Sequence, residues 1–383
     1  MRFRQLRAIA TTASAVALLA PGPVVAGPGE GPSAAVSLGD SFISGEGGRW
    51  LGNSTDPTGD RDGTDRAAKE CGWWGCAYDP GLVYGSSEES GCHRSDTAPI
   101  ESVEIAVQRR VNLACSGART VNLRSAARGG LGHRGEPPQT DRLARVAERL
   151  DVRMVVVTAG ANDLGFGRLV LGCVASWLTT PATDPRPCAA SARAALDGAI
   201  PAARTGLLAV LADVRAAMAA AGYGATDYRL AVAGYASPLP PSRAIRHPEG
   251  GWSRLVAGCP VWDVDADWAA LSATPAVNDL LASAAARRGA EFLDLSRILA
   301  GHELCHRASA RVTSDAPPSA RTSEWVRALA PGQGSLREAL HPNAYGQRAI
   351  GRCLGLLYAT DRGDWSCRRS GPGIRSVQLA PRR

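Results

Sequence analysis

The 383-residue chain has little of several features that define whole classes of protein. Aromatic residues make up only 5% of it, which disfavours a propeller or a platform for stacking nucleic-acid bases. Lys69 is the only lysine. No phosphate-loop, helix-turn-helix or zinc-finger signature occurs, and no run beyond residue 26 is long and apolar enough to suggest a membrane span. We therefore expect neither a nucleic-acid partner nor a transmembrane segment.

The chain does have enough apolar sequence for a sizeable core. Hydrophobic residues make up 45% and charged residues 21%, a balance that excludes a disordered chain. The formal net charge is +7, and arginines at the two ends supply much of it. The arginines near the C-terminus lead us to predict a basic, flexible tail at residues 368–383. These arginines are Arg368, Arg369, Arg375, Arg382 and Arg383.

Residues 1–26 have the three parts of an export signal. Residues 1–7 are basic, residues 8–20 are apolar, and residues 24–26 form an A-x-A-like cleavage site. A retained N-terminal anchor is the alternative, but the apolar run is short for a membrane span. We expect a secreted, extracellular and monomeric protein with a single domain over residues 27–367.

The ten cysteines fit an oxidising compartment, because their number is even. Cys71 and Cys76 have no second ligand pair at zinc spacing nearby, so disulfides are favoured over a zinc site. Residues 46–100 hold three cysteines and suggest a long loop excursion pinned by disulfides. Sequence alone leaves the connectivity open. The simplest pairing joins neighbours in order: Cys71–Cys76, Cys92–Cys115, Cys173–Cys188, Cys259–Cys305 and Cys353–Cys367.

Short apolar segments alternate with helical patterns along the chain. This alternation predicts an α/β domain with a parallel sheet covered on both faces. The predicted strands lie at residues 34–38, 111–114, 154–158, 228–235 and 290–295. The predicted helices lie at residues 140–150, 190–221, 276–288 and 344–358.

Three polar clusters directly follow predicted strands, and a fourth precedes the last helix. The carboxyl ends of parallel strands are where ligands bind, so these clusters can meet at one rim of the sheet. Together they supply a hydroxyl nucleophile, an imidazole base and hydrogen-bond donors, which is the set that acyl transfer needs. The clusters are Gly39-Asp40-Ser41, Ser116-Gly117, Gly160-Ala161-Asn162-Asp163 and His341-Pro342-Asn343.

Four segments resemble the conserved blocks of the SGNH, or GDSL, hydrolases. They are VSLGDSFISGEG (36–47), NLACSGA (112–118), GANDLGFG (160–167) and HPNAYGQ (341–347). The disulfide-rich loops resemble the family's secreted actinobacterial branch of esterases and lipases. The resemblance implies a flavodoxin-like three-layer α/β/α sandwich with a sheet of about five strands. It also implies hydrolysis of a small-molecule or lipid ester through an acyl-serine intermediate, with no metal or organic cofactor.

The resemblance also implies a role for each matching residue. Ser41 would be the nucleophile and His341 its base. The backbone N–H groups of Ser41 and Gly117 and the side-chain amide of Asn162 would form the oxyanion hole. Taken singly, these residues also fit a helix N-cap, a loop histidine and a turn glycine. Asp40 is expected to hydrogen-bond the backbone near the nucleophile turn.

The third member of the triad is where the sequence departs from the family. Many relatives carry Asp three residues before the histidine, and this chain has the longer Glu338. Either the Glu338 carboxylate or a main-chain carbonyl just before His341 can accept from the second ring nitrogen. We favour the carbonyl, and hence a Ser–His dyad.

Several other features offer alternative interpretations. His302-Glu303-Leu304-Cys305-His306 matches the H-E-x-x-H signature of zinc proteases, but Cys305 interrupts it and we expect no metal. A carbohydrate O-deacetylase of the same fold and a non-catalytic secreted binding protein remain alternatives for the function. Three isolated histidines, His93, His133 and His247, are expected at the surface. Three tryptophans could line a cleft or pack within the stapled loops: Trp50, Trp73 and Trp74.

Overall fold

The computed structural model describes residues 28–382, so the predicted export signal at residues 1–26 lies outside it. A seven-stranded sheet forms the centre, in the order β4-β1-β5-β6-β7-β8-β9. Neighbouring strands from β4 to β8 pair in parallel, and β9 is antiparallel to β8. The strands are β1 (Ser33–Gly39), β4 (Arg109–Asn112), β5 (Asp151–Thr158), β6 (Arg229–Ala233), β7 (Glu291–Asp294), β8 (Trp365–Arg369) and β9 (Val377–Pro381).

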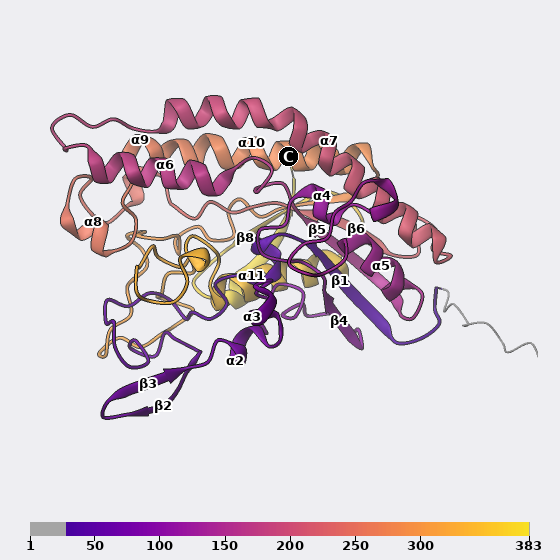
Figure 1. Ribbon diagram of the computed structural model, residues 1–383, viewed down its shortest axis with the longest axis horizontal. Helices are drawn as coiled ribbons and strands as arrows, with labels where there is room; N and C mark the ends of the chain where they lie inside the picture. Colours follow the sequence, from indigo (N-terminus) through magenta and orange to yellow (C-terminus); the bar gives the residue numbers. More distant parts are fainter. Residues whose placement is uncertain (1–27, 383) are drawn as a thin grey trace, which may run out of the picture.

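Helices cover both faces of this sheet, which confirms the predicted three-layer sandwich. In Figure 1, α6, α7 and α10 lie above the sheet and α11 lies below it. The middle of β5 is buried from Met154 to Val157, as a strand covered on both faces requires. The longer helices are α5 (Gln139–Ala147), α6 (Phe166–Thr179), α7 (Ala189–Ala220), α10 (Thr274–Arg287) and α11 (Ala344–Ala359).

Helix α7 is the only helix within residues 28–382 that is long and apolar enough, by length and composition, to cross a membrane. In this fold it packs against α5 and α10. Leu207, Val210 and Leu211 are buried in that contact layer. Its apolar character is therefore that of a core helix, while the expectation that the chain lacks a membrane span stays a prediction.

The C-terminal segment differs from the prediction of a flexible tail. Residues 368–382 complete β8 and form β9, which pairs with β8 along its length. Val377 is buried and Leu379 packs against the core, while Gln378 between them is exposed. This alternation is that of an edge strand with one covered face. The arginines around it concealed the pattern in the sequence.

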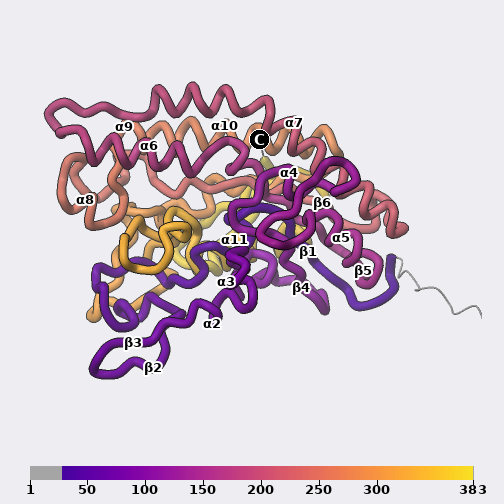
Figure 2. The backbone as a smooth tube through the Cα atoms, viewed as in Figure 1, coloured from indigo at the N-terminus to yellow at the C-terminus, as the bar shows by residue number. Residues whose placement is uncertain are grey.

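The predicted long excursion at residues 46–100 is built from short elements rather than from one structureless loop. It contains a separate hairpin of β2 (Ala68–Gly72) and β3 (Gly75–Tyr78). Figures 1 and 2 show this hairpin protruding from the body.

Short helices occur along the whole described chain. They include α1 (Ser41–Ser44), α2 (Gly81–Tyr84), α3 (Ser87–Ser90), α4 (Thr120–Leu123), α8 (Trp252–Val256), α9 (Asp263–Trp268) and the 3-10 turn η4 (Leu336–Glu338).

All ten cysteines are paired, and the pairs are the neighbours expected from their order. The five bonds are Cys71–Cys76, Cys92–Cys115, Cys173–Cys188, Cys259–Cys305 and Cys353–Cys367. Cys92–Cys115 ties the excursion to the end of β4, and Cys353–Cys367 joins α11 to β8. The prediction of disulfide-pinned loops is confirmed.

Candidate active site

The candidate site lies at the carboxyl edge of three neighbouring strands. β4, β1 and β5 are adjacent in the sheet, and the clusters that contain Gly117, Ser41 and Asn162 follow them in turn. Gly39 closes β1 with φ of 150°, and a Cβ there would lie 2.0 Å from the Thr158 carbonyl oxygen. Only glycine allows this close approach, so it fixes the turn that presents Ser41.

Asp40 holds that turn from inside the core. Its carboxylate accepts hydrogen bonds from the Phe42 N–H at 3.1 Å and from the Tyr235 hydroxyl at 2.6 Å. Burial raises the pKa of Asp40 to about 7, although both hydrogen bonds act to lower it. Asp40 is thus the N-cap of α1, and Ser41 is the first residue of that helix.

Ser41 and His341 are in direct contact although 300 residues separate them. The Ser41 Oγ lies 2.7 Å from His341 Nε2. The other ring nitrogen, Nδ1, lies 3.1 Å from the Ala339 carbonyl oxygen. Because a carbonyl can only accept, Nδ1 must carry the proton, which leaves Nε2 free to accept from the serine hydroxyl. This tautomer is the one that a general base needs.

A strained turn aims the Ala339 carbonyl at the ring. Leu340, between the two residues, has φ of 63°, a conformation that costs a leucine about 1–3 kcal/mol. Two backbone hydrogen bonds with Arg327 hold it: the Leu340 N–H donates at 2.8 Å and the His341 carbonyl accepts at 2.9 Å. On the far side, Asn343 caps α11. The ring is therefore positioned by backbone on both sides.

The Glu338 carboxylate is used elsewhere. It is buried and accepts from the Tyr84 hydroxyl at 2.6 Å, from Trp50 Nε1 at 3.0 Å and from the Ser335 N–H at 3.0 Å. These donors engage both of its oxygens. Glu338 thus anchors the turn that precedes His341 rather than hydrogen-bonding the imidazole.

Each of the three residues expected to form the oxyanion hole has an N–H group available for a further hydrogen bond. As the first residue of α1, Ser41 has no intrahelical acceptor for its N–H. The Gly117 N–H makes no hydrogen bond within residues 28–382, and this residue has φ of 81°. Asn162 donates one amide N–H to the Ala118 carbonyl at 2.9 Å, which leaves the second available.

An apolar pocket of about 210 Å³ adjoins Ser41, Asn162 and His341. Its walls come from α6, α7, α9 and α10. Such a lining favours a hydrocarbon or aryl group beside the serine rather than a sugar ring. Representative lining residues are Leu169, Val170, Leu196, Trp268 and Val277.

Two glutamines that the sequence analysis missed hold the site together. Gln139 accepts from the Gly39 N–H at 2.7 Å and donates to the Gly39 carbonyl at 2.8 Å. Gln347 donates to the Gly45 and Pro342 carbonyls at 2.7 and 2.9 Å, so it ties the nucleophile loop to the histidine loop. Gln347 lies inside the HPNAYGQ block, which was a usable signal. No motif marks Gln139.

The expectation of surface histidines is wrong for His93. It is buried, and its Nδ1 lies 2.6 Å from Glu46 Oε1. Burial lowers the pKa of His93, but the hydrogen bond and the charge of Glu46 outweigh burial and raise the pKa overall. The two residues therefore form an ion pair behind the site. His133 and His247 are half-buried rather than exposed.

The H-E-x-x-H segment does not form the helix that a zinc protease requires. Residues 301–305 are turns and bends, His306 forms an isolated bridge with Ile245, and Cys305 is bonded to Cys259. His302 stacks on Trp325 with ring centroids 4.3 Å apart, and its Nδ1 lies 2.7 Å from the Ser323 carbonyl oxygen. Burial lowers the pKa of His302 to about 4. The two histidines are thus not presented on one helix face.

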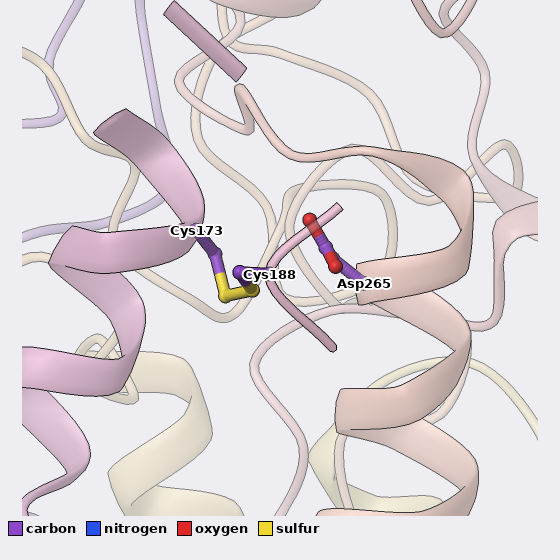
Figure 3. Close-up of side chains that lie close together, drawn as sticks. All are labelled: Cys173, Cys188 and Asp265. Atoms are coloured by element: carbon purple, nitrogen blue, oxygen red, sulfur yellow. A yellow bond between two sulfur atoms is a disulfide. The ribbon is translucent and has the colours of Figure 1, made fainter. Parts of the chain in front are cut away.

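One group, Cys173, Cys188 and Asp265, has metal-ligand atoms close together (Figure 3). The two sulfurs are bonded to each other, so neither is a thiolate that could bind a metal. Asp265 accepts from the Ala189 N–H at 2.8 Å and thereby caps the start of α7. The group is structural.

The tryptophans divide into two kinds. Trp50 is fully buried, and the Arg327 guanidinium lies 3.6 Å from its ring centroid. Trp73 and Trp74, at the tip of the β2–β3 hairpin, are 95% and 97% exposed. The interpretation of packing within the loops therefore holds for Trp50 and is wrong for the other two.

Comparison with known protein families matches the region that holds three of the four sequence blocks. A model of the GDSL-like lipase/acylhydrolase family matches residues 84–349, more than half of the chain. The chain belongs to this family. The matched range includes Gly117, Asn162 and His341, and Ser41 precedes it. No curated protein matches.

Solved structures of several hydrolases resemble the fold. An extracellular lipase from Streptomyces rimosus is 20% identical, with a TM-score of 0.45 over 86% of this chain and 100% of its own. A phospholipase A1 from Streptomyces albidoflavus is 19% identical, with a TM-score of 0.44 over 87% and 100%. A carbohydrate acetylesterase from Sinorhizobium meliloti is 10% identical, with a TM-score of 0.34 over 86% and 98%.

Proposed function

We propose that the protein is a secreted carboxylic ester hydrolase that acts through an acyl-serine intermediate on Ser41. The observation that carries the proposal is the 2.7 Å contact between Ser41 Oγ and His341 Nε2 beside an apolar pocket. A serine hydroxyl is a weak nucleophile until a base accepts its proton, and His341 is in position to do so.

In the proposed acylation, Ser41 Oγ attacks the ester carbonyl carbon while its proton moves to His341 Nε2. The negative charge that develops on the carbonyl oxygen is stabilised by the N–H groups of Ser41, Gly117 and Asn162. One such donor contributes about 3–4 kcal/mol. The intermediate then collapses, the C–O bond to the alcohol breaks, and His341 returns the proton to the alcohol oxygen. Water repeats the sequence on the acyl-enzyme and releases the acid.

The orienting group in this mechanism is the Ala339 carbonyl, so the centre is a Ser–His dyad. The imidazolium that forms in the transition state keeps its Nδ1–H bond to that carbonyl. The neighbouring Glu46–His93 pair and the Glu338 hydrogen bonds keep the buried charges around the site compensated. The proposal assigns Glu338 no proton-transfer role.

The apolar pocket favours an acyl or aryl ester over the acetyl groups of a polysaccharide. Its walls offer few hydrogen-bonding groups to sugar hydroxyls, which would lose their water on entering. Five disulfides support an oxidising, extracellular location. The exported protein is expected to begin at residue 27, which N-terminal sequencing checks.

The test is hydrolysis of p-nitrophenyl esters from acetyl to palmitoyl by the wild type and by Ser41→Ala. We expect Ser41→Ala to be folded and inactive, and an active-serine phosphonate to label Ser41 alone. Ser44, buried three residues away, is the matched control, and Ser44→Ala should keep the label. Activity in Ser41→Ala, or labelling elsewhere, would overturn the assignment.

A further inference from the structure

Helix α6 exposes large apolar side chains at the surface of the molecule. Among its fourteen residues, Phe166–Thr179, Arg168 is the only one with a charge, and only Cys173 is fully buried. Leu171 is 66% and Leu178 is 54% exposed, and their seven-residue spacing puts both on one side of the helix. A soluble helix normally has a polar outer face, whereas the outer side of α6 is polar only near its ends, at Arg168 and Thr179.

The inner side of the same helix lines the pocket of the candidate active site. Leu169, Val170 and Val174 contribute to the pocket wall, whereas Leu171 and Leu178 do not. An apolar surface that faces outward is therefore continuous, through one helix, with the apolar pocket beside Ser41. A molecule that covers the outer side would lie next to the space where an acyl group enters.

The surface continues beyond the end of α6. Trp177 Nε1 donates to the Glu249 carbonyl at 2.9 Å, which fastens the end of α6 to the chain just before α8. Trp252, the first residue of α8, is 76% exposed. Figure 1 shows α6 and α8 close together at one end of the molecule. Tryptophan is the side chain most typical of a boundary between water and lipid.

The charge of this region fits a phosphate-bearing surface. Arg168 is the single ionic group of α6, and no carboxylate accompanies it there. An apolar stripe that carries an arginine is a pattern of helices that lie in a lipid–water interface.

We propose that Leu171 and Leu178 of α6, together with Trp252, form a docking face for the lipid–water interface. The esterase would then take its substrate from a lipid surface rather than from solution. The proposal names the physical form of the substrate, and in this respect it rests on the proposed function. Binding to the surface does not depend on catalysis, so the two can be tested separately.

The binding test uses sedimentation with vesicles of phosphatidylcholine containing phosphatidylglycerol. The mature Ser41→Ala protein is used so that no lipid is consumed. We expect it to sediment with the vesicles, and the added changes Leu171→Ser and Leu178→Ser to weaken binding at least tenfold. Pure phosphatidylcholine should bind a few-fold more weakly, because the attraction between arginine and anionic lipid is lost.

Two sets of changes elsewhere serve as controls. Leu82→Ser with Leu131→Ser removes two leucines of similar exposure away from α6, and vesicle binding should not change. Trp73→Ser with Trp74→Ser tests the exposed hairpin, which lies well apart from α6 in Figure 1. If the hairpin variant loses binding and the α6 variant keeps it, α6 is not the docking face. Thermal unfolding checks that each variant is folded.

A rate test with active protein separates the proposal from the proposed function. The Leu171→Ser, Leu178→Ser variant should hydrolyse dissolved p-nitrophenyl acetate at the wild-type rate, because neither leucine lines the pocket. Its rate on an ester embedded in vesicles should fall at least tenfold. Failure of the wild type on the dissolved ester would contradict the esterase function and leave the vesicle-binding result standing.

Three results would overturn the docking proposal. The first is absence of vesicle binding by the folded wild type. The second is equal binding by the α6 variant. The third is a wild-type dimer in the absence of lipid that the α6 variant converts to monomer, since the face would then be covered by a second copy of the chain.

Discussion

Two segments of the molecule each present a histidine whose Nδ1 faces a backbone carbonyl. His341 faces the Ala339 oxygen at 3.1 Å, and His302 faces the Ser323 oxygen at 2.7 Å. The difference lies at the opposite nitrogen. His341 Nε2 meets the Ser41 hydroxyl beside a pocket, whereas the His302 ring stacks on Trp325 in a buried turn.

The contrast shows that a histidine whose Nδ1 faces a carbonyl can act as a general base only if its Nε2 contacts a group that can give up a proton. The residues around His302 match the H-E-x-x-H signature of zinc proteases, yet in the structure they form a turn that a disulfide holds. The sequence around His341 is a less distinctive motif. The turn that precedes it, however, points the His341 ring at Ser41, which follows the end of β1. Backbone geometry separates the two segments, and each prediction below tests one side of that difference.

The largest effect is expected on the His341 side. His341→Ala removes the proposed base for Ser41, and kcat/KM on a short-chain ester should fall about a thousandfold or more, which corresponds to roughly 4 kcal/mol of transition-state stabilisation. His247→Ala, at a half-buried histidine away from the pocket lining, should stay within about twofold of wild type. Circular dichroism checks folding. A folded His341→Ala that keeps a tenth of the activity would refute its role as the base.

The next effect concerns the disulfide that shapes the His302 segment. Replacing Cys259 and Cys305 by Ser opens a loop of 46 residues and should lower the free energy of unfolding by about 2–5 kcal/mol. The matched pair Cys71 and Cys76 closes a loop of five residues, so its removal should cost about 2 kcal/mol less. Urea unfolding measures both. Equal losses would contradict the loop-length argument.

The redox state of the wild type gives a direct check on the same bonds. Mass measurement after alkylation without reduction should show no modified thiol in the mature protein, because all ten cysteines are paired. Two or more alkylated cysteines would contradict the pairing. Cytoplasmic expression, where thiols stay reduced, should yield poorly folded material.

The sequence predicted what depends on periodicity and on local motifs. All five predicted strands are present, since continuous apolar runs mark strands that are covered on both faces. The meeting of Ser41 and His341 followed from their places at strand ends. The sheet has two further strands, β8 and β9, which were missed because their apolar positions are few and lie among arginines, as at Val377 and Leu379 of β9. Gln139 was missed because a side chain that holds another turn, 100 residues away, leaves no local pattern.

A smaller effect on activity is expected at Glu338. Its carboxylate holds Tyr84 and Trp50 rather than His341, so Glu338→Ala should lower kcat/KM tenfold or less, about 1.4 kcal/mol. Stability should suffer more, by about 2–4 kcal/mol, because buried donors lose their acceptor. Glu338→Gln keeps one of the two acceptor oxygens and should recover part of that stability. A thousandfold loss of activity in folded Glu338→Ala would show that the carboxylate belongs to a triad.

The smallest effect is expected on the His302 side, as a dependence of stability on pH. The pKa of His302 is lowered by burial from 6.5 to about 4 in the folded state, so the unfolded chain takes up the proton first as pH falls. The stability that neutral His302 provides is present in full above pH 6.5 and is lost as pH falls toward 4. Between pH 6.5 and 5.5 the loss is about 1 kcal/mol.

Urea unfolding of wild type and of His302→Gln at these two pH values measures the loss. We expect the variant to be less stable at both pH values, because the Trp325 stacking is lost, and to have the shallower pH dependence. A variant with the same pH dependence as wild type would show that the pKa of His302 is the same in the folded and unfolded states, and the contrast with His341 would then lose its electrostatic basis.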